Sequence, residues 1–112
     1  MKLLTDEIKA QLIENNTRRE DDHIPVVKFF VPWGGATWIL TEMEEDGICF
    51  GLCDLGMGEP ELGYVSVEEL ESVRGPAGLT IERDLYFHTD KPLSVWALAA
   101  KQHRRIVDPD HA

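Results

Sequence analysis

The chain has 112 residues, of which 43% are hydrophobic and 29% are charged, and its formal net charge at pH 7 is −10. This length and balance are typical of one globular domain and exclude an intrinsically disordered chain. No apolar run approaches the roughly 18 residues that a membrane-spanning helix needs, and the first residues turn polar too early for a secretory signal peptide. We therefore expect one cytoplasmic domain over residues 1–112, with an ordered core over about 2–107.

The chain is expected to begin with a helix. Thr5 can cap it, and apolar residues recur at helical spacing at Leu4, Ile8 and Leu12. The asparagines at 15–16 end it. The polar stretch that follows, TRREDDH, is balanced in charge and indicates an exposed loop.

Three consecutive strands are then expected. The stretch over 25–32 is β-branched and aromatic with a proline at each end, which is typical of a strand with marked boundaries. Glycine-containing turns connect it to further strands over 36–43 and 48–54. The sequence thus predicts a three-stranded antiparallel meander over 25–54.

The second half of the chain mixes short strands with helices. A fourth strand is expected over 61–66, and a capping box at Ser66 then begins a helix. An extended segment follows over 79–87, and a final helix over 93–106. The tail over 107–112 is expected to fray.

The final helix is expected to pack through Val95, Leu98 and Ala99, with Trp96 nearby. Together these elements predict an α+β fold. Its sheet is small and antiparallel, a three-stranded meander with one or two short strands added. About three helices are expected to pack on one face of that sheet.

The glycine-rich stretch GICFGLCDLGMGEPELG raises the question of a phosphate site. Its spacing does not match the known phosphate-binding loops, and no lysine follows as in a P-loop. Asp54, Glu59 and Glu61 would repel a phosphate. We interpret the glycines as the means by which the chain reverses between two strands.

Metal binding is not predicted either, nor is any other cofactor. On a strand, the Cα atoms of Cys49 and Cys53 would lie about 13 Å apart, too far to share a zinc ion or a disulfide unless Gly51 formed a bulge. The histidines are scattered, at His23, His88, His103 and His111. We expect both cysteines to be buried free thiols.

One enzymatic alternative remains open. Cys53, Asp54 and His88 supply the residue types of a thiol nucleophile, an orienting acid and a base. Beyond these residue types, nothing in their spacing supports the arrangement. The alternative is a small metal-dependent or hydrolytic enzyme centred on these three residues.

The negative charge is concentrated in the middle of the chain. No Lys or Arg lies between Lys28 and Arg74. The acids of that interval are Glu42, Glu44, Glu45, Asp46, Asp54, Glu59, Glu61, Glu68, Glu69 and Glu71. A surface of one sign repels nucleic acid phosphates and attracts basic partners. The same charge also fits a role in solubility alone.

Two tryptophans flank the Gly-Gly turn between the first two strands. Trp33, at the turn, is expected to be more exposed than Trp38, on the strand. An exposed Trp beside an acidic surface is a typical anchor for a protein partner. Alternatively, both rings close the end of the core.

Several stretches resemble one bacterial family, the domain-of-unknown-function family 2958. They are KLLTDEIKAQL, PVVKFF, GATWILTE, FGLCDLGMGEPELGYVSVEEL, RGPAGL, IERDL with the following Phe87, and KPLS, and the similarity runs from about Lys2 to Val107. Members are typically encoded on plasmids, integrative elements and phages, beside antirestriction and conjugation genes. The family has no established catalytic residues that we can carry over, so the resemblance implies a context and no mechanism.

With that context, the leading hypothesis is a non-enzymatic, acidic partner-binding protein of mobile genetic elements, for example an inhibitor of restriction or CRISPR machinery. The expected partner is a basic, nucleic-acid-handling host protein. We expect no direct binding to nucleic acid or membrane, and a monomer or weak homodimer. The expected binding residues are Glu42, Glu44, Glu45, Asp46, Glu59, Glu61 and Trp33.

Overall fold

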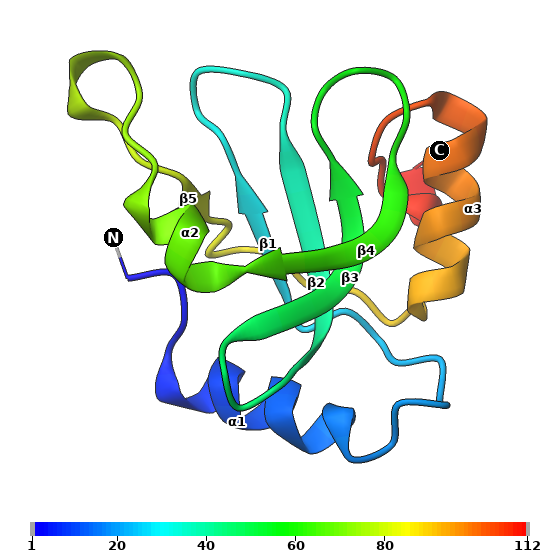
Figure 1. Ribbon diagram of the computed structural model, residues 1–112. Coiled ribbons are helices and arrows are strands. Elements are labelled where there is room, and N and C mark those ends of the chain that lie inside the picture. The colour runs from blue at the N-terminus through cyan, green and yellow to red at the C-terminus, as the bar shows by residue number, and fades with distance from the viewer. Residues whose placement is uncertain (1, 112) are drawn as a thin grey trace.

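A five-stranded antiparallel sheet forms the centre of the protein in the computed structural model, which describes residues 2–111 (Figure 1). The strand order is β4-β3-β2-β1-β5. The strands are β1 (Val27–Phe30), β2 (Thr37–Met43), β3 (Ile48–Asp54), β4 (Glu61–Ser66) and β5 (Glu82–Arg83). The predicted meander is β1-β2-β3. The expected fourth strand pairs with β3, and the extended segment supplies the two-residue β5 beside β1.

Three helices accompany the sheet, in agreement with the expected α+β fold. They are α1 (Asp6–Asn16), α2 (Val67–Ser72) and α3 (Leu93–His103). The two caps read from the sequence are confirmed, because Thr5 Oγ1 accepts from the Ile8 amide at 3.1 Å and Ser66 Oγ from the Glu69 amide at 3.2 Å. Within residues 2–111, no helix has the length and apolar character needed to cross a membrane.

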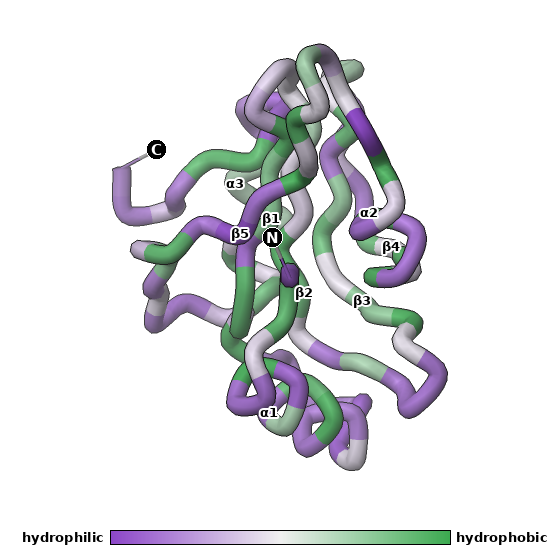
Figure 2. The backbone as a smooth tube through the Cα atoms, turned by 90° about the vertical axis from the view of Figure 1, so that its left-hand side faces the viewer, coloured by the Kyte–Doolittle hydropathy of each residue, from purple (hydrophilic) through white to green (hydrophobic). Residues whose placement is uncertain are grey.

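The helices cover both faces of the sheet, so the expectation that they pack on one face is wrong. Trp38 and Leu40 of β2 pack in a core with residues of α1 and α2, whereas Ile39 between them packs against α3. Neighbouring strand residues point to opposite faces of the sheet, so these are two separate cores. We call the one beside α1 and α2 the first core and the one beside α3 the second core. Figure 2 shows the hydrophobic stretches of β1 and β2 in the middle of the molecule and hydrophilic stretches on α2.

The packed side of α3 also differs from the expectation. Its buried residues are Leu93, Trp96, Ala99 and Ala100. Leu98, which was expected to pack, is 59% exposed. The alanines leave room for the helix to lie against Ile39 and Leu52, the sheet residues of this second core.

A loop far away in sequence holds the start of α3. Pro92 occupies the N-cap position and makes no side-chain capping bond. Asp22, in the loop after α1, accepts hydrogen bonds from both the amide and the hydroxyl of Ser94. The Leu93 amide donates to the His23 carbonyl at 2.9 Å. Asp22 therefore acts as a remote helix cap.

The tail forms a 3₁₀ turn at Pro109–His111 where fraying was expected. Its Asp110 carboxylate lies 3.6 Å from Lys91 Nζ, so the end of the chain is tied to the segment just before α3.

Candidate functional site

The turn between β2 and β3 lies beside the start of α2 and brings several acids together. The Val67 amide donates to the Gly47 carbonyl at 3.3 Å, which joins the turn to the helix. A hollow of about 280 Å³ lies there. The charged residues that line it are Glu45, Asp46, Glu68, Glu71, Asp6, Lys2 and Lys9. Five carboxylates and two ammonium groups therefore share one surface, and its net sign is negative.

Local sequence explains why these acids are displayed. Asp46 Oδ1 accepts from the Ile48 amide at 3.0 Å, and Gly47 takes a φ of 89°, so the Asp-Gly pair closes the turn. Glu68 and Glu69 occupy the first turn of α2, where the helix dipole favours negative charge. We call Glu45, Asp46 and Glu68 the turn acids.

Glu44 contributes less to this surface. It is half-buried, and its Oε1 lies 3.9 Å from the guanidinium of Arg19. Arg19 therefore balances part of the Glu44 charge.

Glu59 and Glu61, which we call the loop acids, lie at the opposite end of β4. Glu61 opens the strand opposite Cys53, whereas Ser66 at the far end lies opposite Ile48, the residue that follows the β2–β3 turn. Six strand residues span about 20 Å. The expected acidic residues thus form two groups separated by the length of β4. Arg104 Nε donates to the Gly58 carbonyl at 3.3 Å, so one base lies beside the loop acids.

Glu42 is buried, with only 6% of its surface exposed, and it presents no carboxylate to a partner. A register shift between Leu40 and Glu42 places it opposite Phe50 in the sheet. Burial raises the pKa of the Glu42 carboxyl, and the nearby His23 and Arg19 offset this in part. We therefore leave Glu42 out of the candidate surface.

Trp33 is half-buried and packs against the first core. A Cβ atom at Gly75 would lie 2.6 Å from three atoms of its indole ring, so the ring lies directly against that glycine. Trp33 is more exposed than Trp38, as expected, but its ring closes the end of the core. It does not line the acidic hollow.

The structure does not assemble the enzymatic alternative. Cys53 packs with the first core, whereas His88 lines a hollow with Trp96 of the second core on the other side of the sheet. Burial raises the pKa of the Cys53 thiol, which disfavours the nucleophilic thiolate. Cys49 is buried too, and its pKa rises to about 12.

Asp54 has a structural role. It is 3% exposed, and its two oxygens accept from the amides of Gly56 at 2.8 Å and Ile106 at 3.0 Å. It joins the β3–β4 loop to the segment after α3. Among residues 2–111, no group of three or more His, Cys, Asp and Glu side chains is placed to hold a metal ion.

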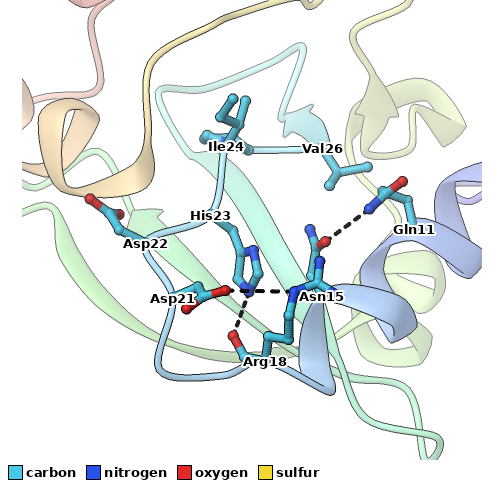
Figure 3. Close-up of a pocket in the computed structure, with 9 residues that line it drawn as sticks. Gln11, Asn15, Arg18, Asp21, Asp22, His23, Ile24 and Val26 are labelled. Atoms are coloured by element: carbon cyan, nitrogen blue, oxygen red, sulfur yellow. Dashed lines mark hydrogen bonds and ion pairs between the residues drawn. The ribbon is translucent and has the colours of Figure 1, made fainter.

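A separate hollow of about 530 Å³ lies between α1 and the loop that follows it (Figure 3). Its polar groups bind one another. The Asn15 amide donates to the Thr41 carbonyl at 2.9 Å and accepts from Gln11 Nε2 at 2.8 Å, and His23 Nε2 lies 2.7 Å from the Arg18 carbonyl. The Asn15 amide joins α1 to β2, and the His23 bond holds the loop that caps α3, so we assign this hollow to the scaffold.

The fold and these surfaces define a small α+β domain with an open antiparallel sheet and acids gathered at the two ends of its edge strand β4. Residues 3–107 match the family described as "Protein of unknown function (DUF2958)", so the chain belongs to that family, and the resemblance is confirmed. No curated protein and no solved structure matches the chain.

Proposed function

We propose that this protein is a non-enzymatic binding protein that engages a basic surface of another protein. The observation that carries the proposal is the convergence of five carboxylates on one hollow that has two lysines; four of the five carboxylates come from the stretch between residues 28 and 74, which has no Lys or Arg. Most of these carboxylates are exposed and lack an ion-pair partner of their own among the described residues.

Electrostatics sets the kind of partner. A single exposed ion pair contributes about 0–1 kcal/mol, so useful affinity requires several pairs made together. The same field repels the phosphates of free nucleic acid. A protein that itself binds nucleic acid presents the complementary surface, a basic channel or face. Occupying that face would block its nucleic acid.

The family resemblance narrows the setting, because members are typical of mobile genetic elements. We propose that the partner is a nucleic-acid-handling protein of the bacterial host, such as a component of restriction or CRISPR machinery, and that binding inhibits it. Burial raises the pKa of both cysteine thiols, which disfavours a thiolate nucleophile and supports a binding role.

The test is affinity capture from a host lysate at low and at high salt, with the retained proteins identified by mass spectrometry. Exposed charges are screened within about 8 Å at physiological ionic strength, so a basic protein should be retained at low salt and released at high salt. Glu45→Lys with Glu68→Lys should weaken capture, because both side chains line the acidic hollow.

A matched control carries Glu7→Lys and Glu20→Lys, which make the same change in net charge at exposed positions outside the two acid groups. It should capture the partner as the wild type does. A specific acidic surface would be contradicted if the partner were retained equally at low and at high salt. It would also be contradicted if both double variants lost the same amount of captured partner. An empty capture at both salt concentrations would contradict the proposal itself.

A further inference from the structure

β4 is an edge strand with an open side. It pairs with β3 in an unbroken register, from Ile48 opposite Ser66 to Cys53 opposite Glu61. No strand of the described chain lies on its other side. Natural proteins usually protect such edges with lysine, proline or a bulge, and β4 has none of these.

The outward-facing backbone groups of β4 can be identified. The Val67 amide donates to the Gly47 carbonyl in the same ladder that pairs β3 with β4. In an antiparallel ladder every second residue bonds to the neighbouring strand. Gly63 lies an even number of residues from Val67, so its backbone N–H and C=O groups point toward β3 and bond to it. Leu62 and Tyr64 direct their N–H and C=O groups to the open edge.

The side chains of the same two residues form an apolar surface on the α3 side of the sheet. Leu62 is 51% and Tyr64 is 59% exposed. The Tyr64 ring packs on Phe50 with centroids 5.1 Å apart, and its hydroxyl accepts from Arg19 at 3.3 Å. Tyr64 is thus held in place while much of it remains accessible. A hollow of about 240 Å³ adjoins it, lined in part by Val65 and Glu69.

Exposed acids lie at both ends of this open edge. The loop acids, Glu59 and Glu61, lie at its start, and Glu68 and Glu69 lie in the helix turn directly after it. The edge therefore combines free backbone groups, two apolar side chains in the middle and negative charge at each end.

We propose that the open edge of β4 receives an extended, basic segment of the partner protein as a sixth strand. This rests on the proposed function and adds how the partner is held. Backbone bonds to Leu62 and Tyr64 would supply affinity, and their side chains would contact apolar residues of the segment. Lys or Arg at the two ends of the segment would meet the acids at the two ends of β4.

A second copy of this chain is a poorer occupant. Two β4 strands paired in antiparallel fashion would bring the acids of each copy near the acids of the other, and the chain already carries a net charge of −10. Like charges placed across a ladder are destabilising. The acids that repel a second copy attract a basic strand.

A defined peptide tests this directly. The probe is an octapeptide with two lysines at each end and alternating valine and threonine between them, titrated at low salt by fluorescence anisotropy. Amide hydrogen exchange is read by NMR on the wild-type protein in parallel. We expect the Leu62 and Tyr64 amides to exchange at least about tenfold more slowly with bound peptide. Gly63, already bonded to β3, should change little.

Two substitutions at Leu62 distinguish the contribution of its backbone amide to peptide affinity from that of its side chain. Leu62→Pro removes an outward amide that the β3 ladder does not use, and we expect peptide affinity to fall at least about tenfold. Leu62→Thr keeps the amide and loses part of the apolar side-chain contact, so affinity should fall by clearly less than with Leu62→Pro, and equal losses would contradict the backbone bond. A peptide with glutamate in place of lysine should not bind. The exchange measurement needs no variant, so it decides the matter even if Leu62→Pro fails to fold.

The remaining outcomes each overturn the inference. Peptide binding without protection of the Leu62 and Tyr64 amides would place the basic segment elsewhere, and the proposed function would stand. No peptide binding at low salt would reject strand addition, while lysate capture would still test the proposed function. If the wild-type protein sediments as a dimer and the Leu62→Pro variant sediments as a monomer, the strand that pairs with β4 belongs to a second copy of this chain.

Discussion

Replacing Gly51 by alanine should strongly destabilise the protein. Gly51 lies in β3 opposite Leu40, beside the register shift in β2. A Cβ atom there would lie 2.0 Å from the Ile39 carbonyl oxygen and 2.8 Å from the Leu40 Cα. Since ordinary contacts are about 3.5 Å, the two strands would have to separate by about 1.5 Å.

The obstructing atoms belong to the backbone of a central strand, so no side-chain rotation can relieve the clash. Overpacking of this kind typically costs 1–3 kcal/mol, and we expect about 3 kcal/mol for Gly51→Ala. For a domain of this size that corresponds to a fall in Tm of about 12 °C. Thermal unfolding followed by circular dichroism, and urea unfolding at 25 °C, measure the change.

Gly63 provides the matched control, because it is the partner of Gly51 across the β3–β4 ladder. A Cβ atom at Gly63 would have nothing within 4 Å. Since glycine in a strand costs about 0.5–1 kcal/mol relative to alanine, Gly63→Ala should leave Tm unchanged or raise it slightly. If the two variants unfold within about 1 kcal/mol of each other, the close approach of β2 and β3 does not constrain this site.

Three further predictions follow from buried polar groups. Asp54→Ala should lower the free energy of unfolding by about 3 kcal/mol in urea, because the buried Asp54 carboxylate is the acceptor for the part-buried amides of Gly56 and Ile106; a loss under about 1 kcal/mol would refute that role. Burial raises the pKa of the Glu42 carboxyl above its ordinary value of 4.5. The folded protein is therefore less stable when Glu42 is ionised: the full loss is present above the raised pKa, and it disappears below pH 4.5, where the carboxyl is protonated in both the folded and the unfolded chain. Glu42→Gln should accordingly raise the urea midpoint at pH 8 and not at pH 4, and equal midpoints at pH 8 would contradict this. Because the pKa of Cys49 is about 12, iodoacetamide at pH 8 should label it only after unfolding, as mass spectrometry can show; rapid labelling of the native protein would mean that the thiol is accessible.

Elements that depend on neighbouring residues were predictable from the sequence. The Asp46-Gly47 turn, the Thr5 cap and the Ser66 cap each form through bonds within a few residues, and all three are present. The meander follows from such turns because they fix which strands come next to each other. The exposure of Glu45, Asp46, Glu59 and Glu61 also agrees with the expectation.

The predictions that were wrong concern features that depend on contacts between residues far apart in the chain. In α3, alanines and larger apolar residues lie on several sides, so the sequence does not distinguish the side that packs from the side with exposed Leu98. β2 carried a readable signal of burial on both faces, since Trp38, Ile39 and Leu40 form a continuous apolar run. That signal should have placed a helix on each face. No local pattern in the sequence indicates the register shift in β2 that buries Glu42.

The order of residues by itself determined that the excess negative charge of this protein lies in the segment between Lys28 and Arg74, which has no Lys or Arg. Only the tertiary structure decided how that charge is arranged. The pairing of β4 with β3 separates the loop acids from the turn acids, leaves one strand edge open between them, and draws Glu68 into the surface. Strand order and register arise from contacts between residues far apart in the chain, and local sequence patterns do not encode them.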